Sequence, residues 1–144
     1  MFIRRATRID SPGVAPLLTQ LGYPATPDQV RARFARAAES EVDAAWVAVT
    51  QSNGQETIVA FAAGHLSWPY ELDHAVAELT ALVVDETHRG EGYGRALVAA
   101  FEDWVASAGG VRASAATALH REGAHSFYER LGYRQLSKKY EKSM

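Results

Sequence analysis

The chain has 144 residues, of which 47% are hydrophobic and 22% are charged, and this is the size and composition of one compact globular domain. Its 15 Lys and Arg against 17 Asp and Glu give a formal net charge of -2, without the basic excess that nucleic-acid binding usually requires. Cysteine is absent, which excludes disulfides, thiolate catalysis and cysteine-ligated zinc.

No stretch of the sequence reaches the roughly 18 consecutive apolar residues of a membrane span. The first residues, Met1 to Arg5, lead directly into polar sequence rather than into the apolar core of a signal peptide. No linker, internal repeat or low-complexity tract interrupts the chain. We therefore expect a single domain over residues 1–144, located in the cytoplasm, with neither nucleic acid nor membrane as a partner.

The first forty residues predict a short strand and two helices. Residues 2–9 are compatible with a strand, and Ser11-Pro12 then begins a helix that ends at Gly22. Its apolar residues have helical spacing: Val14, Leu17, Leu18 and Leu21. A second helix opens at Thr26-Pro27-Asp28-Gln29, which has the form of a capping box.

The remainder of the chain alternates strands and helices. Residues 44–50 and 57–66 flank Asn53-Gly54, a strong tight-turn signal, and predict a hairpin. We then expect a strand over 75–84, a helix over 94–108, a strand over 111–118, a helix over 122–131 and a final strand over 133–142. This order predicts an α/β fold with a mixed sheet and helices on both faces, in which strands 75–84 and 111–118 run parallel.

A glycine-rich segment, Arg89-Gly90-Glu91-Gly92-Tyr93-Gly94, lies between the strand 75–84 and the helix that follows it. Glycine removes side chains, so backbone N–H groups and the positive end of the helix dipole can converge on an anion such as a pyrophosphate. The glycine spacing fits neither the dinucleotide fingerprint nor the Walker pattern. A plain strand-to-helix turn is the alternative interpretation of the segment by itself.

The segment resembles R/Q-x-x-G-x-G/A, the acetyl-CoA pyrophosphate signature of the GNAT (general-control-related N-acetyltransferase) superfamily. Two further stretches are similar to the family pattern. Leu82-Val83-Val84-Asp85 resembles the strand before the loop, and residues 124–133 (AHSFYERLGY) resemble the later helix A-x-x-F-Y-E-x-x-G-F/Y. The resemblance covers nearly the whole chain.

The resemblance implies an acetyl-CoA-dependent N-acetyltransferase that acts on a primary amine, with acetyl-CoA as cosubstrate. It implies a mixed, mostly antiparallel sheet of six to seven strands flanked by about four helices. Two parallel strands, residues 78–84 and 111–117, would be splayed apart around the pantetheine arm. The family commonly dimerises, so a homodimer is one expected assembly. The cofactor contacts implied on this chain are Leu82, Val83, Val84, Arg89, Gly90, Glu91, Gly92, Tyr93, Gly94, Arg95 and Arg121. Arg121 occupies a region where the family often has Asn, and it contacts the cofactor or is simply solvated.

Acetyl transfer requires a proton acceptor for the amine, a donor for the oxyanion and an acid for the departing thiolate. The resemblance implies a main-chain N–H near Val83 or Val84 as the donor and Tyr128 as the acid. It also implies Glu78 as the base. The alternatives are that Tyr128 is a packing residue and that Glu78 is an exposed strand-end carboxylate.

The five histidines have no helical i, i+4 pairing, so we expect no metal site. His65 and His74 are candidates for the border of the acceptor pocket.

The rival function is a non-catalytic acyl-CoA-binding or sensor domain. A pure interaction module is a more distant alternative. The sequence does not identify the amine acceptor.

Overall fold

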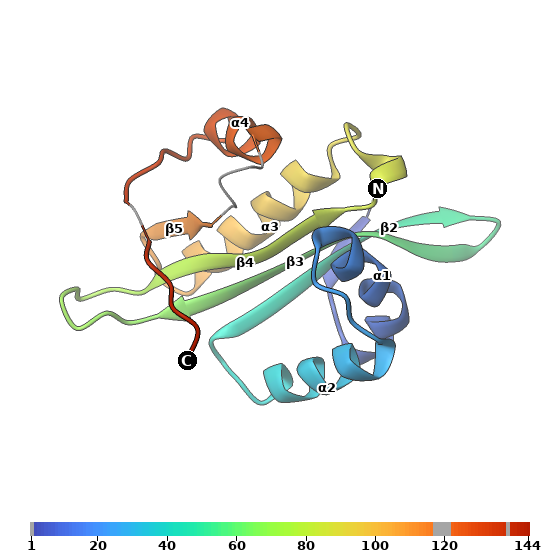
Figure 1. Cartoon of the computed structure of the whole chain (residues 1–144), viewed down its shortest axis with the longest axis horizontal. Coiled ribbons are helices and arrows are strands. Elements are labelled where there is room, and N and C mark those ends of the chain that lie inside the picture. Colours follow the sequence, from blue (N-terminus) through green and yellow to red (C-terminus); the bar gives the residue numbers. More distant parts are fainter. Residues whose placement is uncertain (1, 117–121, 138) are drawn as a thin grey trace.

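The computed structural model describes residues 2–116, 122–137 and 139–144. Its described residues form one five-stranded sheet, four α-helices and two short 3-10 helices (Figure 1). In chain order these are β1 (Phe2–Arg5), η1 (Arg8–Asp10), α1 (Ser11–Leu21), α2 (Pro27–Ala38), β2 (Asp43–Ser52), β3 (Gln55–Ser67), β4 (Val76–Val84), η2 (Glu86–His88), α3 (Tyr93–Ser107), β5 (Arg112–Ala115) and α4 (Glu122–Arg130).

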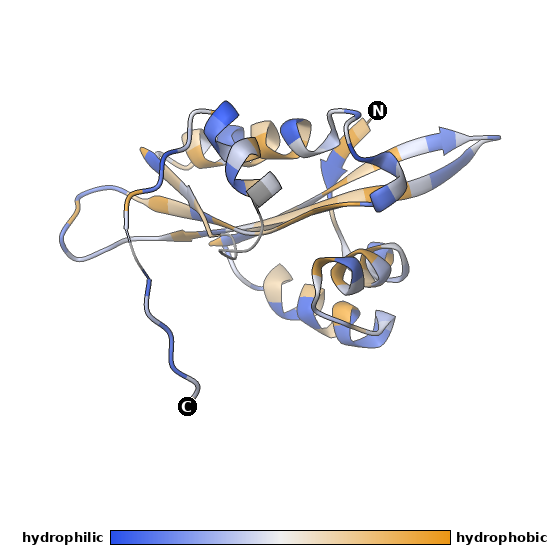
Figure 2. Ribbon diagram, turned by 45° about the horizontal axis from the view of Figure 1, so that its top comes forward, coloured by the Kyte–Doolittle hydropathy of each residue, from blue (hydrophilic) through white to orange (hydrophobic). Residues whose placement is uncertain are grey.

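The sheet is mixed, with strand order β1-β2-β3-β4-β5. The first four strands pair with their neighbours in antiparallel fashion, whereas β4 and β5 are parallel. The parallel pairing predicted from the helical connection through α3 is confirmed. Helices α1 and α2 cover one face of the sheet, and α3 and α4 lie on the other (Figures 1 and 2).

Two local signals in the sequence produce the predicted structures. The backbone N–H of Gln29 donates to Thr26 Oγ1 at 3.2 Å, and Thr26 N–H donates to Gln29 Oε1 at 3.0 Å. This is the reciprocal capping box, and it starts α2. Between β2 and β3, Asn53 and Gly54 both have positive φ, 52° and 76°, as a tight hairpin turn with the strand twist requires.

The prediction of six to seven strands is wrong for the described residues, which form five. The strand expected over 133–142 is absent from the described part of that range, residues 133–137 and 139–142. Alternating residues do not make a strand unless a neighbouring backbone accepts the ladder hydrogen bonds. Here the C-terminal segment extends away from the sheet (Figure 2), with Leu136 and Tyr140 exposed. Strand β5 covers Arg112–Ala115 of the expected range 111–118, of which residues 117 and 118 lie outside the described residues.

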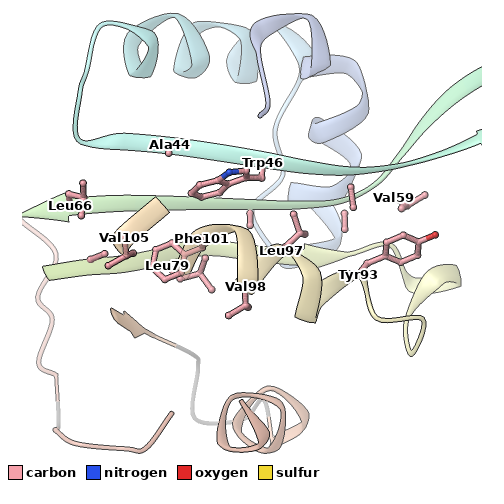
Figure 3. Close-up of a cluster of buried hydrophobic side chains, with 14 of the residues drawn as sticks. Ala44, Trp46, Val59, Leu66, Leu79, Tyr93, Leu97, Val98, Phe101 and Val105 are labelled. Carbon is pink, nitrogen blue, oxygen red and sulfur yellow. The ribbon is translucent and has the colours of Figure 1, made fainter. Parts of the chain in front are cut away.

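The hydrophobic core has two parts, one on each face of the sheet. On the α3 face, the ring of Trp46 from β2 packs edge-on against Phe101 and Trp104 of α3, with centroid distances of 6.3 and 5.6 Å. Figure 3 shows the Trp46 and Phe101 rings between β2 and α3, beside Leu97 and Leu79. On the other face, Val14 and Leu17 of α1 pack against Val47 and Val49 of β2.

Gly64 in β3 lets α3 approach the sheet this closely. A Cβ atom built on Gly64 would lie 2.8 Å from Phe101 Cδ1 and 3.1 Å from Trp104 Cζ3. Any side chain at position 64 would therefore push α3 away from β3. Because α3 begins at the glycine-rich segment, its placement on the sheet also positions that segment.

Gly64→Ala should lower the free energy of unfolding by about 1–3 kcal/mol, the usual cost of overpacking a core. Urea denaturation monitored by circular dichroism measures it. The matched control is Gly123→Ala in α4, where a built Cβ meets nothing within 4 Å and no loss is expected. Equal stability of the two variants would contradict the packing role assigned to Gly64.

Candidate active site

Strands β4 and β5 are paired only along the first half of β4. Their paired residues run from Val76 with Arg112 to Leu79 with Ala115, and β4 then continues for five residues with no β5 partner among the described residues. On its other edge, β4 stays paired with β3 as far as Val84. In the described part of the chain, the backbone N–H and C=O groups of residues 80–84 that face β5 therefore have no strand partner, and they leave an opening between the two strands. We call this opening the fork.

A bulge in β4 coincides with the start of the fork. Ala63 of β3 pairs with Ala81, but the next residue, Gly64, pairs with Leu79, so Thr80 is the extra residue. A bulge bends the strand and increases its local twist. Both effects turn the second half of β4 away from the line of β5.

The glycine-rich segment follows β4 and delivers the N-terminus of α3. Gly90 and Gly92 have positive φ, 81° and 91°, and Gly92 is the N-cap of α3. The first N–H groups of α3 have no partner within the helix, and the helix dipole makes this end positive. A Cβ built on Gly90 would meet no atom within 4 Å, so the segment is open on that side. These features favour an anion at the end of the fork.

The turn between β4 and α3 is held by Asp85. Its carboxylate accepts hydrogen bonds from Gln20 Nε2 at 2.8 Å, from the Thr87 N–H at 3.1 Å and from the Thr87 hydroxyl, and it lies 3.1 Å from His88 Nδ1. The hydrogen bonds from Gln20, Thr87 and His88, in that order, hold the pKa of Asp85 well below its usual value. Gln20 Oε1 also accepts a hydrogen bond from the Glu86 N–H at 3.0 Å, so the Gln20 side chain connects α1 to the turn.

Sequence reasoning missed the role of Gln20. Asp85 directly after a strand was a usable signal, because Asp readily bonds to the backbone N–H two residues on. No local pattern joins Gln20 to a residue 65 positions away. Only the packing of α1 on the sheet brings the two side chains together.

The predicted cofactor-binding residues lie along the fork and the turn, in differing environments. Val83 and Tyr93 are buried, and Tyr93 packs edge-on against His88. Leu82 and Val84 are half-buried against the core on the α3 face. Arg89, Glu91 and Arg95 are exposed, and Arg89 Nε donates to the Val84 carbonyl at 3.4 Å. Arg121 lies outside the described residues.

Helix α4 packs against the start of α3. A Cβ on Gly94 would lie 3.3 Å from Phe127 Cζ and 3.7 Å from Val84 Cγ2, so Phe127 packs where β4 ends and α3 begins. The next residue, Tyr128, is half-buried between the rings of Phe127 and Tyr133, at centroid distances of 5.3 and 5.7 Å. Burial raises the pKa of Tyr128.

The neighbouring Tyr133 differs from Tyr128 in having a hydrogen-bond partner. Its hydroxyl donates to Glu102 Oε2 at 2.8 Å. Burial and this hydrogen bond raise the pKa of Tyr133. The Tyr128 hydroxyl forms no hydrogen bond with any residue that the structure describes.

Glu78 lies one residue before the last β4–β5 pair and is half-buried. Its neighbours Ala77 and Leu79 point into the core on the α3 face, so Glu78 points to the opposite face. Glu78 and Tyr128 thus lie on opposite sides of the sheet.

His74, in the loop before β4, has a buried Nδ1 atom with no hydrogen bond in the described structure.

The described residues contain no group of three or more His, Asp or Glu side chains that could hold a metal ion. None of their helices is long and apolar enough to cross a membrane.

A hollow of about 540 Å³ borders Gln20 and Asp85 on the α1 side, away from the open edge of β4.

A family model described as the Acetyltransferase (GNAT) family matches residues 15–133. Among solved structures, a tetramutant of the BH1408 protein from Bacillus halodurans is 27% identical with a TM-score of 0.83, and the match covers all of both chains. A candidate acetyltransferase from Agrobacterium tumefaciens is 25% identical with a TM-score of 0.86, again over all of both chains.

The aminoglycoside N-acetyltransferase AAC(6′)-Iy, solved in complex with CoA, shares the fold at 18% identity and a TM-score of 0.83, with 99% of this chain and 93% of that chain covered. No curated protein matches the chain.

Proposed function

Because the chain belongs to the Acetyltransferase (GNAT) family, we propose that it is a single-domain N-acetyltransferase that moves an acetyl group from acetyl-CoA to a primary amine. The acceptor is a small molecule or a peptide. The observation that carries this proposal is the fork, whose open backbone edge leads directly to the N-terminus of α3.

The residues present fit acetyl-CoA. The open edge of Leu82, Val83 and Val84 suits the amide groups of a pantetheine arm, which pair as a neighbouring strand would. The turn and the first residues of α3 suit the pyrophosphate. These are Arg89, Gly90, Glu91, Gly92, Tyr93, Gly94 and Arg95, to which we add Arg121. The CoA bound to the structurally similar AAC(6′)-Iy supports this assignment.

When bound, the cosubstrate supplies an acetyl group activated as a thioester. Glu78 attracts the ammonium form of the acceptor and takes its proton, directly or through water. A main-chain N–H near Val83 or Val84 donates to the carbonyl oxygen on which negative charge develops. Tyr128 donates a proton to the departing sulfur. A phenol of ordinary pKa about 10 is protonated at neutral pH and can donate; burial raises the pKa of Tyr128, which makes it a weaker acid.

The second candidate is a non-catalytic acyl-CoA sensor, and the same fork favours it. Release of free thiol from acetyl-CoA separates the two functions. We expect amine-dependent release with at least one member of a panel of spermidine, lysine, an aminoglycoside and a peptide with a free N-terminus. Binding of acetyl-CoA without any release would favour the sensor.

Gly92→Val should weaken acetyl-CoA binding about tenfold or more, because a β-branched residue at positive φ is strained by 1–3 kcal/mol and its side chain obstructs the pyrophosphate. Calorimetry measures the affinity. Gly109→Val, at a φ of 76° beyond the other end of α3, is the matched control for backbone strain. Unchanged affinity in folded Gly92→Val protein would remove the glycine-rich segment from the cofactor site.

Tyr128→Phe should lower kcat by roughly 10²-fold, the span of general acid catalysis. Affinity for acetyl-CoA should barely change, since the ring and its packing remain. Tyr133→Phe is the control: it removes a hydroxyl bonded to Glu102 and should leave kcat near wild type. Full turnover of Tyr128→Phe would make Tyr128 a packing residue.

Glu78→Gln preserves size while removing charge and basicity. An ammonium of pKa about 10.4 leaves only about one molecule in 2,500 as free amine at pH 7. As a base, Glu78 predicts a kcat loss of roughly 10²-fold in the Gln variant, partly relieved at high pH. As a binding carboxylate, it predicts a raised KM with little change in kcat.

A pH–rate series distinguishes these two roles of Glu78. Its control is Glu56→Gln, which removes an ion pair with Arg4 at the far end of β3. Wild-type rates for Glu78→Gln at every pH would exclude Glu78 from the site.

A further inference from the structure

A row of polar side chains crosses the sheet at the mouth of the fork. Asp43 of β2 pairs with His65 of β3, His65 pairs with Glu78 of β4, and Glu78 pairs with Ser114 of β5. Directly opposite residues in a sheet share a face, with Cβ atoms about 4.5–5.5 Å apart in antiparallel pairs. Asp43, His65 and Glu78 are therefore consecutive neighbours on the face opposite α3.

Asp43 fixes the chemical state of the His65 ring. His65 Nδ1 lies 2.8 Å from Asp43 Oδ1. Burial alone would raise the pKa of Asp43, but hydrogen bonds from His65 and Ser40 outweigh it and hold that pKa below its usual value. The ionised carboxylate can only accept, so Nδ1 carries the hydrogen and the Nε2 lone pair is available as a base.

The ring is also accessible to water. The side chains of His65 and Asp43 are 45% and 37% exposed, and Nε2 has no hydrogen-bond partner in the part of the chain that the structure describes. A proton that reaches Nε2 can therefore leave to solvent. Among the described residues, the charged groups directly opposite His65 in the sheet are Asp43 on β2 and Glu78 on β4. Arg112 of β5 lies on the same face, one row beyond Glu78.

A carboxylate alone is a poor final acceptor for the proton of an ammonium ion. The ordinary pKa values are about 10.4 for an ammonium, 4.3 for Glu and 6.5 for His. Transfer to Glu is uphill by about six units, whereas transfer to an imidazole is uphill by about four. A histidine beside the carboxylate therefore holds the proton about a hundred times more favourably.

We propose that His65, oriented by Asp43, is the group that receives the amine proton from Glu78. This inference rests on the proposed acetyltransferase function. One N–H bond of the ammonium breaks and its electron pair stays on nitrogen. The proton binds a Glu78 oxygen, then moves to His65 Nε2, where Asp43 stabilises the imidazolium, and finally passes to water. His65 thus positions and relays a proton for Glu78 and does not contact the acetyl group.

The first test needs no substrate. Long-range ¹H–¹⁵N NMR of the imidazole rings, with assignment by His65→Ala, should show His65 as the Nδ1–H form near neutral pH. Asp43→Asn should lose this preference, whereas Asp28→Asn, which removes the ion pair with Arg31 on α2, should keep it. An Nε2–H ring in the wild type would overturn the proposal, because its free lone pair would face Asp43.

The second test uses the amine that the wild type acetylates fastest. His65→Ala should lower kcat roughly 10²-fold near neutral pH and recover toward wild type at high pH or when imidazole is added to the buffer. Asp43→Asn should show a smaller loss. Asp28→Asn should match wild type.

The outcomes separate this inference from the proposed function. Full activity of His65→Ala, or a loss that imidazole and high pH do not relieve, overturns the role of His65 and leaves the acetyltransferase standing. A wild type that binds acetyl-CoA but acetylates no amine overturns both. Unchanged acetyl-CoA affinity in the variants, measured by calorimetry, shows that any loss arises at the acceptor side.

Discussion

A strand inside a sheet normally satisfies its backbone N–H and C=O groups on both edges, and among the described residues β4 has strand partners on both edges only as far as Leu79. Beyond that residue, the edge that faces β5 needs a different partner. The bulge at Thr80 turns the strand at this point. The rest of the site depends on this interruption, because it places open backbone groups and the end of β4 beside the N-terminus of α3.

The two cores hold the fork in place from opposite faces. On one face, Gly64 allows Phe101 and Trp104 to pack directly on β3, which sets the position of α3. On the other face, α1 reaches the turn after β4 through Gln20 and Asp85. The glycine-rich segment is therefore fixed at both ends. A site for a charged ligand benefits from this arrangement, since ordering a loose segment would cost conformational entropy on binding.

The two faces of the sheet also divide the proposed chemistry. Tyr128 lies on the α3 face among aromatic rings, where burial raises the pKa of its phenol. Glu78 lies on the other face, beside the exposed Asp43 and His65 pair. The general acid needs to be protonated and is shielded from water here, whereas the general base must pass its proton on to water. The alternation of side chains along β4 places Glu78 on one face, whereas the packing of α4 against the core places Tyr128 on the other.

The sequence by itself determined the features that local physics controls. The capping box at Thr26, the Asn53-Gly54 hairpin, the glycine-rich turn and the parallel direction of β4 and β5 all follow from neighbouring residues or from one helical connection. Only the tertiary structure decided the features that join distant residues. The Gln20–Asp85 clamp, the Asp43–His65 pair and the missing strand after Tyr133 depend on which backbones lie next to one another. Sequence periodicity shows which face a side chain takes, but it does not say which strand or helix lies opposite that face.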